Sequence, residues 1–454
     1  MSADEIFSLL FLLLTLYFML KHVLISKKSR HLGISVLCYI MALLSKENGL
    51  AFVILIPLTL YFITKEKFIV ILKLSAPYVM VAVAYIAVRI LMIGINNNEV
   101  TEVMDNPYVL ASLSEKYATL LLVFLKYIQL LIFPHPLTYD YSFNQIPYRN
   151  FSDMWVLFSL FLHLLMVIFV VLNFKKKDIL AWCILLYAGS IFLVSNIAFN
   201  IGAPMAERFL FQPSVAFVIF LVELWRRFVA RGLLNYQGFS SLTFIILIPA
   251  IIISCYAAIK RNQVWQSDEV LFLTDVKTSY GSARANTYAG VALIRLCDRS
   301  KNPQLKQDYA LDALDYFRRS LQIKSDYITT LLNMGVAYSR LDSVEEAEAV
   351  WNHARAVNPN DKNFIVYDRY LAESFYKQGL KAGVNKDFQV AIINLENSLE
   401  YEPVNVEGWY NLGGAYYSIK QYTEAKSCWE KTLQLNPKHE QAALGLEALL
   451  EIGY

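Results

Sequence analysis

The sequence predicts an all-α protein in which a polytopic helical membrane domain is followed by a soluble helical solenoid. Two observations carry this prediction. Residues 5–258 are a succession of apolar runs, whereas residues 266–454 have the composition of soluble helices. Only 17% of the 454 residues are charged, against about 25% in average soluble domains. The deficit lies in the first half, so we expect a membrane domain at 1–258 and a separate soluble domain.

Eight apolar runs in the first half are candidate membrane spans. They cover residues 6–20, 33–45, 48–63, 74–94, 155–173, 179–197, 209–225 and 242–258. Several are shorter than the roughly 20 residues that cross a bilayer, so their bounds are approximate. The stretch 32–63 is almost wholly apolar and is interrupted by Ser45, Lys46, Glu47 and Asn48. Because its halves lack a polar face, we expect a membrane hairpin with a Lys-Glu pair at its turn.

The basic residues of this half orient it in the membrane, because loops rich in Lys and Arg stay cytoplasmic. The basic clusters are Lys21 to His31, Lys65 to Lys73, Lys175 to Lys177, and Arg226 and Arg227 with Arg231. The loops poor in Lys and Arg are 45–48, 134–150, 196–208, and 95–112 with Glu99, Glu102 and Asp105. We therefore expect these loops, and the chain from residue 259 onward, on the periplasmic or lumenal side.

Successive loops should alternate between the two sides of the membrane if every apolar run crosses it. A ninth apolar run, 113–133, does not fit, because the loops on both of its sides are expected to be external. It carries Lys126 near its middle, which costs about 2.5–3.5 kcal/mol at the bilayer centre. We predict a re-entrant or interfacial helix there. The alternative is that this run crosses the membrane, which would reverse the side expected for every later loop.

The second half contains repeats of the tetratricopeptide (TPR) pattern. One full copy has Met334, Gly335, Tyr338, Ala347, Trp351, Ala354 and Pro359, and another has Trp409, Leu412, Gly413, Tyr416, Ala425, Trp429 and Pro437. A third copy has Phe375, Gly379, Ala391, Leu395 and Pro403, and a degenerate first copy has Tyr288, Ala292, Ala313, Phe317 and Ser320 around an insertion at 298–308. We expect a connector at 259–281, repeats at 282–325, 328–361, 372–405 and 406–439, and a cap helix at 440–454.

The aromatic residues of these repeats are expected to form the core of the solenoid. Small residues at the Gly and Ala positions let paired helices approach closely, and proline ends the second helix of a pair. TPR arrays bind peptide segments or partner proteins on their concave side, so we expect a protein or peptide partner. Fold alone does not give function, and docking of the array on its own membrane domain is the alternative.

Composition and motifs exclude several other functions. A net charge of +3 is too small to indicate nucleic-acid binding. The five cysteines are scattered without a CxxC pair, so we expect neither a metal site nor a disulfide framework. The motifs GxSxG, HExxH, the P-loop and the dinucleotide-binding glycine fingerprint are absent from the sequence. The N-terminus has no basic region or cleavage site of a signal peptide.

The expected topology gathers one set of polar residues on the external face. These are Lys46 and Glu47, Asp140, Tyr141 and Ser142, and Glu207 and Arg208. Two cations at headgroup depth suit a lipid phosphate, because Arg binds phosphate in a bidentate manner and Lys supplies a point charge. The alternative for Lys46 and Arg208 is interfacial anchoring, as we expect for Arg89. Glu207 is an expected partner of Arg208 or Lys46, and Asp140 has the alternative of orienting its own loop.

Four motifs in this order carry a resemblance to a known family: ALLSKENGL, PHPLTYDYS, MAERFLFQPS, and RNQVW before the repeats. The chain resembles the transmembrane and TPR-repeat-containing protein O-mannosyltransferases and their bacterial homologues, within the polytopic C-type glycosyltransferases. The resemblance implies transfer of a sugar, in the manner of protein O-mannosylation, from a polyprenyl-phosphate carrier to a hydroxyl on an external acceptor. It also implies that Lys46 and Arg208 lie near the carrier phosphate, and we add Glu207 and Tyr141 to this donor site. No cofactor other than this lipid-linked sugar is expected.

The chain also departs from the family. Its opening, SADEIFSLLF, resembles the point just after the large first external loop, which carries the acidic residue or pair that serves catalysis in the family. We therefore expect a chain that lacks the catalytic loop and is inactive alone. Glu47 and Asp140 are the remaining weak candidates for the general base that would activate an acceptor hydroxyl.

Two functions therefore compete. The first is a membrane glycosyltransferase whose periplasmic or lumenal TPR domain recruits the acceptor. The second is a non-enzymatic, membrane-anchored TPR scaffold that assembles envelope proteins. A transporter is a weaker third possibility, because charges within the spans are sparse and no inverted repeat of broken helices is evident.

Overall fold

The computed structural model describes residues 3–94, 102–104, 106–198, 200–230 and 236–454. Three residues named above, Glu99, Asp105 and Arg231, lie outside these ranges. The described residues form nineteen α-helices and no β-strand, which confirms the predicted fold class. The chain divides into two compact units, Met1–Asn286 (unit 1) and Thr287–Tyr454 (unit 2).

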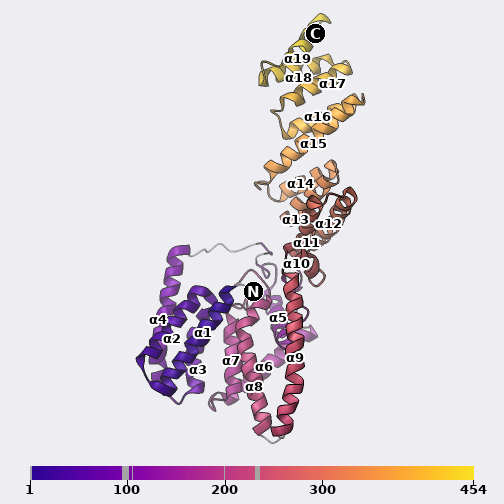
Figure 1. Cartoon of the computed structure of the whole chain (residues 1–454). Helices are drawn as coiled ribbons and strands as arrows, with labels where there is room; N and C mark the ends of the chain where they lie inside the picture. The colour runs from indigo at the N-terminus through magenta and orange to yellow at the C-terminus, as the bar shows by residue number, and fades with distance from the viewer. Residues whose placement is uncertain (1–2, 95–101, 105, 199, 231–235) are drawn as a thin grey trace. The chain divides into compact units, whose positions relative to one another are not determined.

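Unit 1 contains the apolar helices (Figure 1). Its elements are α1 (Ala3–Lys21), the π-helical turn η1 (His22–Ser26), α2 (Ser29–Ser45), the 3-10 turn η2 (Glu47–Ala51), α3 (Phe52–Ile63), α4 (Phe68–Ile93), α5 (Leu113–Ile132), α6 (Met154–Phe174), α7 (Ile179–Phe192), the 3-10 turn η3 (Glu207–Leu210), α8 (Phe211–Ala230), α9 (Tyr236–Val264) and α10 (Asp268–Asp275). Among the described residues, four helical segments are long and apolar enough to cross a membrane: Ala3–Ser26, Phe68–Met92, Met154–Phe174 and Glu207–Ala230. Three apolar segments are shorter: Ser29–Ser45, Glu47–Ile63 and Ile179–Phe192.

The helices α7 and α5 bear on two of the predicted segments, 179–197 and 113–133. The predicted span 179–197 contains a helix only as far as Phe192, and Asn196 beyond it has a positive φ of 59°. The ambiguous run at 113–133 is one continuous helix, α5, and carries Glu115, Lys116 and Lys126. It is not among the four segments above. That α5 does not cross the bilayer stays a prediction.

The core of unit 1 lies where α1, α2, α3, α4, α7 and α8 meet. Large side chains that are fully buried there include Leu12, Met19, Tyr39, Ile56 and Tyr78. Because lipid tails are as apolar as these groups, close van der Waals packing rather than exclusion of water holds such helices together in a membrane. The bundle therefore holds the ends of these helices in fixed positions, which matters for the charged side chains described below.

The connections between helices that are rich in Lys and Arg lie at one end of the unit 1 bundle. The connections that carry the basic clusters, α1 to α2, α3 to α4, α6 to α7 and the end of α8, gather at one end of the bundle, the lower end in Figure 1. Two contacts tie them together there: Lys177 Nζ donates to the Thr64 carbonyl at 2.8 Å, and Arg227 lies 2.8 Å from Asp178. The starts of α1 and α8 and the ends of α4 and α9 lie at the opposite end. The end of α2 lies there too, because Lys46 contacts Asp4 in the first turn of α1.

Unit 2 is an array of antiparallel helix pairs. The helices are α11 (Ala283–Arg299), which begins within unit 1, α12 (Pro303–Ile323), α13 (Ile328–Arg340), α14 (Val344–Val357), α15 (Phe364–Val384), α16 (Phe388–Tyr401), α17 (Val406–Ser418), α18 (Tyr422–Leu435) and α19 (Glu440–Glu451). The third repeat begins earlier than its pattern predicts, because α15 starts at Phe364 and not at 372. The insertion at 298–308 forms a turn and lengthens α12, which Asn302 caps before Pro303.

The tryptophans of the repeats pack directly on glycines of the paired helix. Trp351 is buried and donates its indole N–H to the Leu332 carbonyl at 3.0 Å. Trp429 does the same toward the Tyr410 carbonyl at 3.1 Å. A Cβ atom at Gly413 would lie 2.5 Å from Trp429 Nε1. Glycine is therefore required at this position for the two helices to approach.

Replacing Gly413 with alanine is expected to lower the free energy of unfolding of unit 2 by about 1–3 kcal/mol, because the added methyl overpacks the interface. The neighbouring Gly414 on the same helix is the control, since a Cβ there meets open space. Gly414→Ala is expected to be neutral or to stabilise by roughly 0.5–1 kcal/mol through backbone entropy. Thermal unfolding of the full chain, with hydrogen exchange over α17 and α18, measures both; equal effects would contradict this packing.

Candidate functional site

A cluster of two carboxylates and a lysine lies at the end of the bundle opposite the basic connections. Lys46 Nζ is 2.8 Å from Asp4 Oδ2 and 3.6 Å from Glu5 Oε1. Glu5 is buried, whereas Asp4 remains partly exposed. Lys46 is therefore a partner of carboxylates of the first helix rather than a free cation.

Local backbone geometry places Lys46 in this position. Helix α2 ends at Ser45, and Lys46 adopts an extended conformation (φ −157°, ψ 135°) before the 3-10 turn η2 begins. The antiparallel packing of α1 on α2 brings the turn beside the first turn of α1. The hydrogen bond with Asp4 raises the pKa of Lys46 above its usual value, so the ammonium stays protonated.

Glu47 points to a different partner. Its carboxylate is 3.6 Å from Arg89 Nη1, and both side chains are about half-exposed. Arg89 also donates to the Tyr85 hydroxyl at 3.4 Å. An exposed pair of this kind contributes little to stability. Glu47 thus lies at the border of the cluster, where it pairs with Arg89 near the end of α4.

Arg208 lies within electrostatic reach of Glu5. It sits in η3 at the start of α8, where the Tyr127 hydroxyl accepts the Ala206 N–H at 3.1 Å and anchors the segment. Among the residues that the structure describes, Arg208 forms no ion pair. One turn further along, Gln212 Oε1 is buried without a hydrogen-bond partner in the described part of the chain. Arg208 is therefore the cation of this cluster that is open to an anionic ligand.

Glu207 does not pair with Arg208 or Lys46, in contrast to the sequence-based expectation. Its Oε1 accepts the Thr138 N–H at 2.6 Å and the Tyr141 hydroxyl at 3.0 Å. Burial, together with the nearby Glu207 carboxylate, raises the pKa of Tyr141. Adjacent residues on a 3-10 turn point to different sides, so Glu207 faces the 134–150 loop and Arg208 faces α1. Glu207 and Tyr141 hold this loop at the edge of the site.

Asp140 is buried within its own loop. It accepts hydrogen bonds from the Ser142 hydroxyl at 2.6 Å and from the Ser282 hydroxyl. Asp275 supports the same loop, because it accepts the Tyr139 N–H at 2.7 Å and binds Arg261 at 2.5 Å. This geometry favours the reading of Asp140 as a residue that orients its loop, and it places Asp140 apart from the Lys46 cluster.

Asp4 and Glu5 are the residues that sequence reasoning missed. Their acidic pair was interpreted only as the start of the first span. The basic cluster Lys21 to His31 follows the first apolar run and is expected on the cytoplasmic side, so the start of that run falls on the same side of the membrane as the 45–48 turn. That agreement, with two acidic residues beside the first apolar run and a lysine at the turn, was the available signal. Among the described residues, no group of His, Cys, Asp and Glu is arranged to hold a metal ion.

Replacing Glu207 with alanine is expected to loosen the 134–150 loop. The change leaves the Thr138 N–H and the Tyr141 hydroxyl without their acceptor, at a cost of about 1–3 kcal/mol. Hydrogen exchange of peptides covering this loop is expected to become faster. Glu47→Ala is the control, because its partner is half-exposed. Unchanged exchange in the Glu207 variant would contradict the role assigned to this carboxylate.

A family model described as "Tetratricopeptide repeat" matches residues 406–439. Protein O-mannosyl-transferase TMTC3 of Homo sapiens is 25% identical over 362 residues, covering 69% of this chain and 37% of the human protein. Protein O-mannosyl-transferase TMTC1 of Mus musculus is 28% identical over 222 residues, covering 45% of this chain and 21% of that protein. The chain is related to the TMTC protein O-mannosyl-transferases.

The resemblance predicted from the four motifs is thereby confirmed, and the chain is a membrane protein with TPR repeats. It spans between 21% and 37% of the length of these curated relatives, with 32% for TMTC3 from Mus musculus. Among solved structures, MamA is 16% identical, covering 38% of this chain and 88% of MamA, with a TM-score of 0.24. YrrB, described as a TPR protein with an unusual peptide-binding site, is also 16% identical, covering 44% of this chain and 88% of YrrB, with a TM-score of 0.24.

Proposed function

We propose that the chain transfers a sugar, in the manner of protein O-mannosylation, from a polyprenyl-phosphate carrier to a hydroxyl of a protein acceptor. The observation that carries this proposal is the cluster of Asp4, Glu5 and Lys46 beside Arg208. It combines two carboxylates with a cation that has no ion-pair partner among the described residues. The relationship to protein O-mannosyl-transferases supports the same reaction class.

The cluster offers both groups that this reaction needs. Arg208 binds the carrier phosphate and stabilises the negative charge that the phosphate gains as the sugar leaves. A carboxylate of Asp4 or Glu5 accepts the proton of the acceptor hydroxyl, whose oxygen then bonds to the anomeric carbon. The bond between that carbon and the carrier phosphate breaks, and the phosphate leaves with the bonding electrons. The products are the glycosylated acceptor and the carrier phosphate.

Lys46 acts through the carboxylates in this proposal. Its ammonium lies 2.8 Å from Asp4 and 3.6 Å from Glu5 and holds the two carboxylates in place beside each other. Lys46 is therefore a positioning residue, and Arg208 alone binds the donor phosphate. This assignment replaces the sequence-based expectations that Lys46 binds the phosphate and that a base is missing. It also replaces Glu47 and Asp140 as candidates for that base.

The proposed topology has several spans and places the cluster on the periplasmic or lumenal side. Support comes from the basic connections, which gather at the other end of unit 1 and suit the cytoplasmic side. Helix α9 ends at the same end of unit 1 as the start of α1 (Figure 1), and Arg261 near its end binds Asp275, which accepts the Tyr139 N–H of the 134–150 loop. Unit 2 would therefore lie on the same side as the reaction, where its repeats would bind the acceptor protein.

A transfer assay tests the proposal. The full chain in lipid nanodiscs is supplied with polyprenyl-phosphate mannose carrying a radiolabelled sugar, and with a serine- and threonine-rich acceptor protein. We expect labelled acceptor that accumulates with time and is absent without the chain. Failure to label the acceptor, by a chain that is folded and binds the donor, would contradict the proposal and favour the membrane-anchored scaffold.

A further inference from the structure

A groove between α5 and α6 lies outside the cluster described above. Its volume is about 710 Å³, and its polar lining side chains are Lys126, Gln129, Arg149 and Asp153. Tyr127, next to Lys126, turns to another side of α5, where its hydroxyl accepts the Ala206 N–H. Consecutive helical residues point about 100° apart. The groove and the Arg208 segment therefore lie on different faces of the same helix.

The mouth of this groove has an excess of positive charge. Lys126 is half-buried and forms no hydrogen bond or ion pair with any residue in the described part of the chain. Arg149 is close enough to Lys126 to interact with it electrostatically. Its guanidinium is 3.1 Å from the Asp153 carboxylate. That carboxylate also accepts the Trp155 N–H and caps α6. The groove thus has two cations but one carboxylate, and that carboxylate pairs with Arg149. An anion beside Lys126 would offset the cost of burying its charge.

Two apolar hollows adjoin the groove along the bundle. A hollow of about 300 Å³ shares Ile128, Ile132 and Leu162 with the groove. A further hollow of about 320 Å³ shares Met166, Ile184 and Tyr187 with the second. We call the three together the α5–α6 track. Its lining on α6 runs from Trp155 to Val171, roughly 24 Å at the rise of an α-helix.

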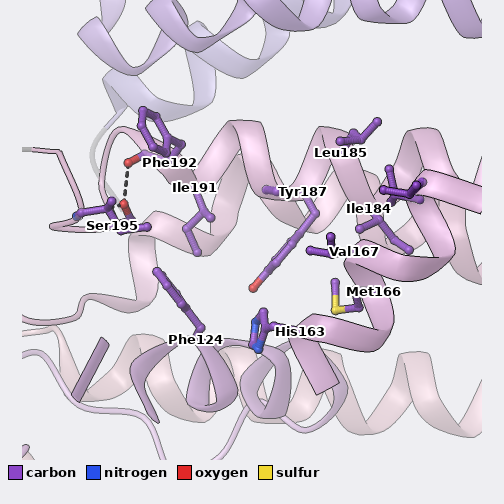
Figure 2. Close-up of a pocket in the computed structure, with 14 residues that line it drawn as sticks. Phe124, His163, Met166, Val167, Ile184, Leu185, Tyr187, Ile191, Phe192 and Ser195 are labelled. Atoms are coloured by element: carbon purple, nitrogen blue, oxygen red, sulfur yellow. Dashed lines mark hydrogen bonds between the residues drawn. The ribbon is translucent and has the colours of Figure 1, made fainter. Parts of the chain in front are cut away.

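Figure 2 shows the far hollow of this track. Its walls are apolar side chains of α5, α6 and α7, and His163 and Tyr187 reach toward one another across it. The Tyr187 hydroxyl has no hydrogen-bond partner among the described residues. A charged or strongly polar ligand does not suit this end, whereas a hydrocarbon chain does.

We propose that the α5–α6 track binds a single-chain lipid phosphate, with its phosphate between Lys126 and Arg149 and its hydrocarbon chain along the apolar hollows. Arg149 and Asp153 lie just before α6 begins, so the phosphate sits at a helix end and the chain follows α6 inward. The hollows adjoin one another in a single row, which suits one hydrocarbon chain and favours a polyprenyl-type lipid over a two-chain phospholipid. The choice of this lipid rests on the proposed function, whereas the charge and the shape of the track do not.

In that setting the track is a second site for the carrier, separate from the site of transfer at Arg208. It would hold a carrier phosphate on the α6 side of α5 while the cluster on the other side is occupied. The two sites use different cations, so they are separable by substitution.

Binding of undecaprenyl phosphate to the full chain tests the proposal. The chain is reconstituted in phosphatidylcholine nanodiscs, without sugar or acceptor, and retained lipid is measured by native mass spectrometry. Lys126→Gln with Arg149→Gln is expected to lower retention at least tenfold. Leu162→Trp, which fills the track and leaves both cations, is expected to do the same. Lys116→Gln, on α5 but outside the track lining, is the control and is expected to bind as the wild type does.

Competition identifies the ligand class. Undecaprenol, phosphatidylglycerol and inorganic phosphate are expected to displace the probe at least tenfold less well than undecaprenyl phosphate. Equal displacement by any of them, or unchanged retention in the double variant and in Leu162→Trp, would overturn the proposal. Asp4→Asn with Glu5→Gln is expected to abolish transfer and leave this binding unchanged. Failure of the transfer reaction is therefore distinguishable from failure of the track.

Discussion

Replacing Arg208 with glutamine is expected to reduce sugar transfer by about 10²–10³-fold. This is the usual loss when one group that stabilises developing negative charge is removed from an active site. Arg208 is the cation of the cluster that forms no ion pair with a described residue, whereas Lys46 lies against Asp4 and Glu5. Its loss therefore removes the charge available to the carrier phosphate. The rate of transfer to an acceptor protein, at equal amounts of inserted chain, measures the effect.

Arg208→Lys is the matched variant. Lysine keeps the charge but cannot bind phosphate in a bidentate manner, so we expect a rate between those of the wild type and Arg208→Gln. Arg226→Gln, at the basic end of the bundle, is the control for general loss of charge and is expected to retain transfer. Wild-type rates in Arg208→Gln would exclude Arg208 as the phosphate ligand.

Trp351→Ala is expected to lower the free energy of unfolding of unit 2 by about 3–5 kcal/mol. Trp351 is 2% exposed, stacks on Tyr367 with ring centroids 4.6 Å apart, and bonds to the Leu332 carbonyl. Its removal leaves a cavity between α13, α14 and α15. Because each repeat is stabilised by its neighbours, the loss is expected to spread to adjacent helix pairs. Hydrogen exchange over α13 to α16 in the full chain measures it.

Ile365→Ala is the control for this substitution. Ile365 lies on α15 beside Phe364, and its side chain is 72% exposed. Truncating it removes little buried surface, so exchange is expected to stay within about 0.5 kcal/mol of the wild type. If both variants behaved alike, Trp351 would not be part of the core of the solenoid.

The repeat architecture was predictable from the sequence because the positions of the TPR pattern contact helices that are close in sequence. The aromatic residues Trp351 and Phe375 are expected in the core, and both are buried, as are Ala391 and Leu395 of the same pattern. Each contacts a helix that is close in sequence, so spacing alone places it. The early start of α15 was not predictable in this way, because residues before the pattern carry no signature position. Phe364 is nevertheless buried there, and it anchors the additional turns.

The candidate site was predicted only in part, because its contacts join distant segments. The expected topology placed Lys46 and Arg208 on one side, and the structure does place Lys46 and Arg208 near Glu5. Pattern and spacing gave no partner for Lys46, since Asp4 lies 42 residues away in sequence. Glu207 was misassigned for the same reason, because its partner Thr138 is 69 residues away. Such contacts depend on how helices distant in sequence pack together, and a short sequence motif carries no information about that packing.

The rate of sugar transfer by the Asp4→Asn/Glu5→Gln double variant tests the role of the two carboxylates most directly. Both substitutions keep the shape of the side chains and remove the groups that would accept the proton. We expect transfer to fall by at least 10²-fold, while a Glu66→Gln variant, changed in the connection between α3 and α4, keeps its rate. Transfer by the double variant at the wild-type rate would contradict the assignment of the reaction to this cluster.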